Sequence, residues 1–540
     1  MASKIYKVVH LVDEGYEKTE LPLKGEGNYR KELNFWHVVL LTVGAIFGSA
    51  VAFVPVYVLA YGGPAGILAW PIALLLILPI AFVYVELGSM WPRAGGVAYY
   101  PARSHGTLVG LINGWSTFLG YTLALPTQVA VVIEYIGFYY PPLYRNNVIT
   151  PLGIGIGIVM LFLIFIVEVR HVKIIGNINN GFTIAKGSLM VLIALVLITF
   201  FRVGNFTANG GFAPLGVSGI FLAISATIFA YAGFRQPIDY AEEVKNPGKF
   251  LPRAISISLV IVMILYVLES LAFLGTISWS KLNLSPGSWG SLFSLGSPFT
   301  TASVDVGLAA FGVLAVIVII IASFSDGLVY WGGAARIGNT MSRYNNYFPD
   351  FFADLSKRGI PFNSVVVVFV IAAFYLVLLH SFASLIGVFV DAVVISYAQS
   401  AISLAIFREK NPDEKRPYKL PAYKIMAPLA YVLAGLLVYW SGFTAVSISI
   451  ASVYAGLLFL ILAKKKNNFS VEDMYAGMWL PFYLFTVVVI SYFGSSFFGG
   501  TNFLKFPYDN IAFILDTLLF YFIGFHSGLG YHGKGVADAT

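Results

Sequence analysis

The sequence predicts an all-α integral membrane protein with about fourteen membrane-spanning helices. The 540 residues are 58% hydrophobic and only 11% charged, whereas about a quarter of the residues in soluble domains are charged. The mean hydropathy is +0.81 over the whole chain. Apolar stretches of about 20 residues, enough to cross the hydrocarbon core, recur from end to end. This composition disfavours a water-soluble enzyme, and the absence of cysteine excludes disulfides and thiolate metal sites.

The apolar stretches set the positions of the predicted spans. The first 34 residues are polar and lack the apolar core of a signal peptide, so the first span follows this tail. The predicted spans are residues 36–60, 66–90, 107–137, 150–169, 178–201, 217–240, 254–277, 303–331, 362–379, 383–407, 424–442, 446–463, 476–495 and 510–527.

The distribution of basic residues predicts that both termini are cytoplasmic. Lysine and arginine collect in cytoplasmic loops. Of the 33 basic residues in the chain, the predicted outer loops hold only Arg145, Arg202, Lys281 and Lys505. An even number of spans in the cell membrane accounts for this asymmetry. The net charge of +7 then reflects topology and attraction to anionic lipid, and no nucleic-acid partner is needed to explain it.

The middle of the first span contains small residues where a plain spanning helix prefers leucine or isoleucine. The run from Gly44 to Ser49 places two glycines and a serine at a depth where broken backbone is tolerated only beside a cavity. A break here exposes backbone amides. The alternative is that these small residues let a neighbouring helix approach closely.

The sixth span carries a second interruption. Residues 229–237 combine Gly233, Arg235 and Pro237 near the middle of the span. Paired interruptions in corresponding helices of two halves are typical of a transporter site at the bilayer midplane. Free amides of the first break suit a carboxylate, and free carbonyls of the second suit an ammonium group. The pair of breaks therefore predicts an amino-acid site built mostly from backbone.

Several motifs resemble the amino acid, polyamine and organocation (APC) transporter superfamily. Residues 86–96, ELGSMWPRAGG, resemble its E-L-x-x-x-x-P-x-x-G-G signature, and residues 44–49 resemble its G-x-I-x-G-[ST]-G motif. Residues 229–234 with the run AEEVKNP at 241–247 resemble its sixth span and exit. Residues 336–349 and 416–421 resemble its eighth and tenth loops, so the similarity covers about residues 34–465.

This resemblance implies a five-plus-five inverted-repeat core in which helices 1 and 6 are discontinuous, and secondary transport of amino acids or related amines by alternating access. The segments are then a cytoplasmic tail (1–34), the transport core with spans 1–10 (35–408), an inner loop with spans 11 and 12 (409–466), and spans 13 and 14 with a short cytoplasmic tail (467–540). The expected substrate-binding residues are Ala45, Ile46, Gly48, Ser49, Phe229, Ala230, Tyr231 and Gly233.

Lys186 is the strongest candidate for coupling transport to protons. It lies about ten residues into the fifth span, hence ~15 Å along the helix, too deep to reach the interface easily. A desolvated amine there can gain and lose a proton within a transport cycle. The resemblance implies that a lysine in this span takes the place of sodium in related carriers and reaches a first-span carbonyl, here near Gly44. The alternative is a static partner for a buried acid.

The chain departs from the family pattern at two positions. Ala50 replaces the third glycine of the first-span motif, and Arg235 replaces an acidic residue that often follows the sixth-span Gly-Phe pair. Arg235 either attracts a substrate carboxylate or forms an inner gate by pairing with Asp239 or Glu86. Tyr231 narrows the site or serves as a core or gate aromatic.

No pattern in the sequence indicates catalysis. The seven histidines show no metal-ligand spacing, and no Gly-x-x-x-x-Gly-Lys-[Ser/Thr] loop for ATP is present. We therefore expect no cofactor and no metal, with an amino acid or amine, protons and lipid as partners and a monomer sufficient for transport. An exchanger, a sodium-coupled carrier of the same superfamily, and a channel remain alternatives.

Overall fold

Helices make up nearly all of the regular structure. The computed structural model describes residues 28–145, 148–170, 172–345, 347–465 and 469–532, so most of the predicted N-terminal tail lies outside the described residues. The long helices of the first ten predicted spans are α2 (Phe35–Ile46), α3 (Ala50–Gly62), α4 (Ala69–Met90), α6 (Thr107–Gly137), α7 (Pro151–Glu168), α8 (Val172–Ile198), α9 (Gly216–Tyr231), α11 (Pro247–Thr276), α13 (Ala309–Arg343), α14 (Phe362–Leu378) and α15 (Phe382–Lys410).

The rest of the chain adds a second group of helices and several short connecting elements. The C-terminal helices are α16 (Tyr423–Trp440), α17 (Phe443–Ala455), α18 (Phe459–Lys465), α19 (Val471–Gly477), α20 (Trp479–Phe493) and α21 (Tyr508–Leu529). The connecting elements include α5 (Gly96–His105), α10 (Gln236–Asp239), α12 (Pro298–Asp305) and an antiparallel hairpin of β1 (Tyr144–Arg145) with β2 (Val148–Ile149).

The predicted all-α membrane class is confirmed. Among the described residues, eleven helical stretches are long and apolar enough to cross a membrane. One of them, Ala50–Met90, joins α3 and α4 through the 3₁₀ turn η1 (Gly63–Leu68). Two shorter apolar helices, α2 and α14, accompany these stretches. The number of fourteen spans and the inverted repeat stay predictions.

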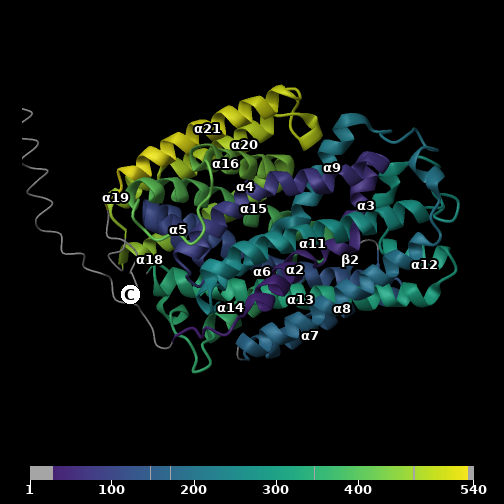
Figure 1. Cartoon of the computed structure of the whole chain (residues 1–540), viewed down its shortest axis with the longest axis horizontal. Coiled ribbons are helices and arrows are strands. Elements are labelled where there is room, and N and C mark those ends of the chain that lie inside the picture. The colour runs from purple at the N-terminus through teal and green to yellow at the C-terminus, as the bar shows by residue number, and fades with distance from the viewer. Residues whose placement is uncertain (1–27, 146–147, 171, 346, 466–468, 533–540) are drawn as a thin grey trace, which may run out of the picture.

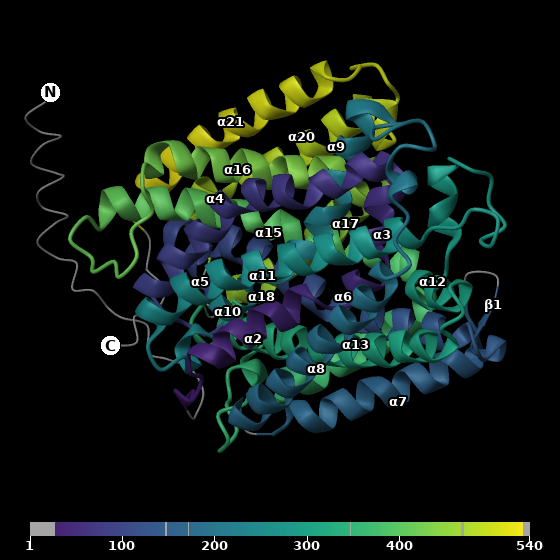
Figure 2. The same ribbon diagram turned by 45° about the vertical axis from the view of Figure 1, so that its right-hand side comes forward.

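The helices form one elongated bundle around α6. The most apolar window of α6 is entirely buried, and α13 and α15 pack along this central helix. Figures 1 and 2 show α20 and α21 along one edge of the bundle and α7 along the opposite edge. The fourth predicted span and the last two therefore lie on opposite edges of the bundle.

The outer helices present apolar side chains away from the bundle. Only 28% of the apolar window of α7 is buried. Large residues such as Leu152, Val159 and Phe162 are about half exposed. An apolar face of this size is unfavourable in water and favourable in lipid. The exposed faces therefore support the membrane assignment independently of helix length.

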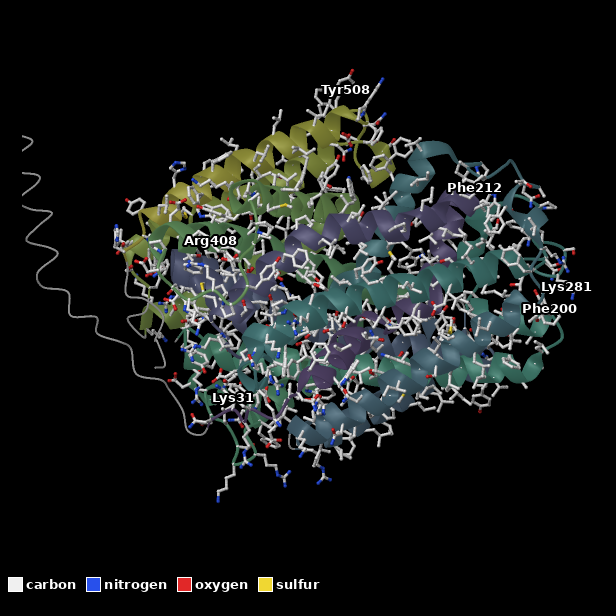
Figure 3. The ribbon with its side chains drawn as sticks, in the orientation of Figure 1. Lys31, Phe200, Phe212, Lys281, Arg408 and Tyr508 are labelled. Carbon is white, nitrogen blue, oxygen red and sulfur yellow. The ribbon has the colours of Figure 1, made fainter. Side chains whose placement is uncertain are left out.

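The two ends of the bundle carry the segments predicted for opposite sides of the membrane. Figure 3 shows Lys31 and Arg408 toward one end and Lys281, Phe200 and Phe212 toward the other. This separation is the one that the basic residues of the sequence predict. The side on which each terminus lies stays a prediction.

The predicted eighth span differs from the bounds of helix α13 at both ends. The sequence placed it at 303–331, but α13 begins at Ala309 because residues 298–305 form the separate helix α12. The helix then continues to Arg343. In its polar last part Arg336 forms a buried ion pair with Glu243, a residue far away in the sequence. The third span, by contrast, agrees with α6 at both ends.

Candidate functional site

The first span is broken where its small residues lie. Helix α2 ends at Ile46 and α3 begins at Ala50, so Phe47, Gly48 and Ser49 form the break. The Ser49 amide donates to the side-chain oxygen of Gln128 at 2.9 Å. A methyl group on Gly48 would lie 2.3 Å from the carboxyl carbon of Asp326. Glycine is required here because α13 approaches the backbone so closely.

The sixth span is broken at the predicted place and touches the first break. Helix α9 ends at Tyr231 and is followed by the 3₁₀ turn η4 (Ala232–Arg235) and the short helix α10. A methyl group on Gly233 would lie 2.1 Å from the carbonyl oxygen of Ala45. The structure therefore brings the two interruptions into direct contact.

The predicted substrate-binding residues lie at this contact, although not all of them face it. Ile46 accepts a hydrogen bond from Tyr266 Oη at 2.8 Å, and Tyr266 stacks on Trp70 with ring centroids 4.4 Å apart. Tyr231 donates to the carbonyl of Trp70 at 3.2 Å, so its phenol joins this aromatic cluster. Ala230 is buried in α9 and Phe229 lies beside it in the same helix.

Lys186 connects α8 to the broken first span. Its side chain is fully buried, and Nζ donates to the carbonyl oxygen of Gly44 at 2.9 Å and to Ser325 Oγ at 3.1 Å. Ser325 in turn donates to Asn179 Oδ1 at 2.9 Å. Asn179, Thr183 and Lys186 recur every three or four residues on α8, so they share one face of that helix. The amine therefore lies among oxygen atoms from three helices.

A carboxyl lies on the other side of the first break. Asp326 on α13 accepts a hydrogen bond from the Gln128 side chain. Gln128 thus joins the Ser49 amide to Asp326. Both side chains are almost fully buried. Gln128 was not predicted from the sequence, because only ionisable residues within the spans were considered. The signal that identifies Gln128 is a side-chain amide in an otherwise apolar span.

Arg235 lies in a cage of tyrosines. Its Nε donates to Tyr121 Oη at 3.0 Å, and Nη1 donates to Ser396 Oγ at 2.7 Å and Tyr84 Oη at 3.2 Å. Tyr121 donates in turn to Asp239 Oδ2 at 2.9 Å. The structure therefore brings Arg235 and Asp239 to one shared tyrosine, and their predicted pairing is indirect.

Glu86 belongs to a separate ion cluster. Its carboxylate binds Arg408, with Nη2 to Oε2 at 2.7 Å, and lies 3.3 Å from Arg416 Nε. The amide of Leu420 donates to Oε2 at 2.7 Å. The cluster links the end of α4 to the end of α15 and to the loop that follows it. The alternative pair of Glu86 with Arg235 does not form in this structure, because both oxygens of Glu86 are engaged by these partners.

Removal of the Glu86 carboxylate should destabilise the fold. Glu86→Ala leaves Arg408 and Arg416 buried without their shared counter-charge. We expect the free energy of unfolding to fall by roughly 3 kcal/mol, the lower end of the cost of breaking a buried pair. Thermal unfolding in detergent measures the change, with Asp413→Ala in the exposed loop as the control. An unfolding midpoint equal to that of the unmodified chain would contradict the structural role.

The chain matches a known protein family over most of its length. Residues 33–464 match the family model described as amino acid permease. An aspartate-proton symporter of Bacillus subtilis is 30% identical over 93% of this chain and 98% of its own length. The glutamate/serine transporter AimA of the same organism is 29% identical over 94% and 96%, respectively.

A more distant relative transports amino acids with a different class of side chain. The aromatic amino acid transport protein AroP of Escherichia coli K12 is 23% identical over 72% of this chain and 83% of its own length. All of these relatives are transporters. The chain belongs to the amino acid permease family of the APC superfamily and is a multi-pass transporter of the cell membrane, not an enzyme.

Proposed function

We propose that this chain is a proton-coupled symporter that moves an amino acid across the membrane by alternating access. The observation that carries the proposal is the pair of hydrogen bonds from Lys186 to the Gly44 carbonyl and to Ser325. These bonds make the position of α2 depend on the protonation state of one buried amine. The name of the aspartate-proton symporter among the relatives supports the same coupling.

The substrate binds between the two breaks. Its α-carboxylate displaces the Gln128 side chain from the Ser49 amide and takes this amide together with that of Ala50, where the N-terminus of α3 supplies a favourable partial charge. Its ammonium group takes carbonyls at the C-terminal end of α9, near Phe229 and Ala230. Because Gly233 lies against Ala45, a bound amino acid contacts both broken helices at once.

Lys186 couples this site to the proton. When protonated, the amine holds Gly44 and keeps α2 against α8 and α13. When it loses its proton to the other side of the membrane, its hold on the carbonyl weakens and α2 is free to move. A sodium ion at this position would need the same oxygen atoms as ligands, and the Lys186 amine already donates hydrogen bonds to these atoms. This geometry favours protons over sodium.

Vesicle transport tests the proposal. Thermal-shift measurements with the twenty amino acids and common polyamines identify a substrate, which is then supplied to purified protein in liposomes. We expect accumulation when the outside is acidic, at clamped membrane potential and without sodium. Accumulation that requires sodium, or counterflow without any net accumulation under a pH gradient, would show instead the sodium-coupled carrier or the exchanger.

A further inference from the structure

One nitrogen of the Arg235 guanidinium lacks a partner. The side chain is fully buried. Nε and Nη1 are engaged by Tyr121, Tyr84 and Ser396, but Nη2 has no hydrogen-bond partner among the described residues. A buried charged group that lacks a hydrogen-bond partner bears the cost of its lost hydration, so an unpaired nitrogen of a buried guanidinium is unfavourable. Such a group calls for an acceptor that arrives from outside the protein.

The cage around Arg235 holds the guanidinium in one orientation. Its central carbon lies 4.5 Å from the ring centroid of Tyr397. The ring centroids of Tyr121 and Tyr84 lie 5.4 and 5.5 Å away, respectively. Tyr397 also donates to the carbonyl of Ala232 within the broken segment. The tyrosines thus connect the orientation of Arg235 to the backbone of the break. The free arm is preorganised, and binding an anion there requires little further ordering.

Arg235 lies close to the proposed substrate site along the chain. It follows Gly233 by two residues in the same 3₁₀ turn, η4, and Tyr397 links its guanidinium to that turn. The side chain of an acidic amino acid bound at the breaks extends by one or two methylene groups to a carboxylate. A guanidinium matches a carboxylate in charge and in hydrogen-bonding geometry.

We propose that Nη2 of Arg235 receives the side-chain carboxylate of an acidic amino acid, so that the chain selects aspartate or glutamate. This inference rests on the proposed function and names the substrate class of the same site. An acidic amino acid carries a net charge of about −1 at neutral pH, so a cotransported proton also offsets its charge.

Binding by acids and their amides tests this assignment. Glutamate against glutamine, and aspartate against asparagine, differ in charge but hardly in shape. We expect the unmodified protein to bind the acids about ten- to a hundredfold more tightly than the amides, which corresponds to one charge-assisted hydrogen bond. In Arg235→Gln this ratio should fall to about one while glutamine still binds. Calorimetry or competition against a labelled substrate measures both ratios.

Ser396→Ala is the matched control. It removes an acceptor from Nη1 and leaves Nη2 in place, so the acid-to-amide ratio should stay high. A gate residue without contact to substrate would lower transport of acids and amides alike in Arg235→Gln and leave their ratio unchanged, which would overturn the assignment. If that variant does not fold, equal binding of acids and amides by the unmodified protein overturns it as well. Binding of neutral amino acids without preference defeats this inference alone, whereas failure to transport any amino acid defeats the proposed function.

Discussion

Lys186→Ala should abolish accumulation driven by a pH gradient while exchange of substrate across the membrane continues. The variant loses the amine that donates to the Gly44 carbonyl and to Ser325, which is the group proposed to carry the coupled proton. The breaks, which are the proposed substrate site, keep their backbone groups. One pH unit supports at most about tenfold accumulation per coupled proton. The unmodified protein should approach that ratio, and the variant should remain at equilibrium.

Liposome uptake and counterflow of the same labelled substrate distinguish the two activities. Lys173→Ala is the matched control because Lys173 is an exposed lysine on the same helix, α8. Lys186→Met keeps more of the side-chain volume and provides a second variant if the alanine variant is unstable. Accumulation by either variant at the level of the unmodified protein would contradict the assignment of Lys186 to coupling.

Gly233→Ala should stop transport altogether. The added methyl group would lie 2.1 Å from the Ala45 carbonyl oxygen, which is backbone and cannot rotate away. The two breaks must then separate or distort, and overpacking of this kind costs about 1–3 kcal/mol. Because substrate binding depends on the relative position of the breaks, uptake and counterflow should both fall to background.

Gly181→Ala separates this effect from a general change at glycine. Gly181 is exposed on α8, and a methyl group there meets no atom within 4 Å. The control should keep full transport and equal or greater stability, since alanine favours helix over glycine by about 1 kcal/mol. Size-exclusion chromatography establishes that Gly233→Ala is folded. Transport by this variant at the normal rate would contradict the close contact between the breaks.

The helical class and the two breaks could be predicted from the sequence because both depend on local composition. Glycine, serine and proline within an apolar stretch weaken a helix wherever it packs, and the structure breaks at residues 47–49 and 232–235. The depth of Lys186 followed from its distance along the span. Its hydrogen bond to the Gly44 carbonyl agrees with the contact implied by the family resemblance.

The contacts that link distant segments could not be predicted in the same way. Arg336 in the last part of α13 binds Glu243, and Glu86 binds Arg408 rather than Arg235. Each pairing depends on which helices are neighbours, and the local pattern carries no such information. Gln128 was overlooked for a related reason, since an amide becomes informative only when the broken backbone and Asp326 are known to lie beside it.

The position of a bound amino acid tests the central claim most directly. An electron cryo-microscopy structure in the presence of a transported substrate should show its carboxylate at the amides of Ser49 and Ala50. Its ammonium group should lie at the carbonyls that end α9. Density for the substrate elsewhere in the bundle, with Gly233 still against Ala45 and no ligand at either break, would contradict a site formed by the two interrupted helices.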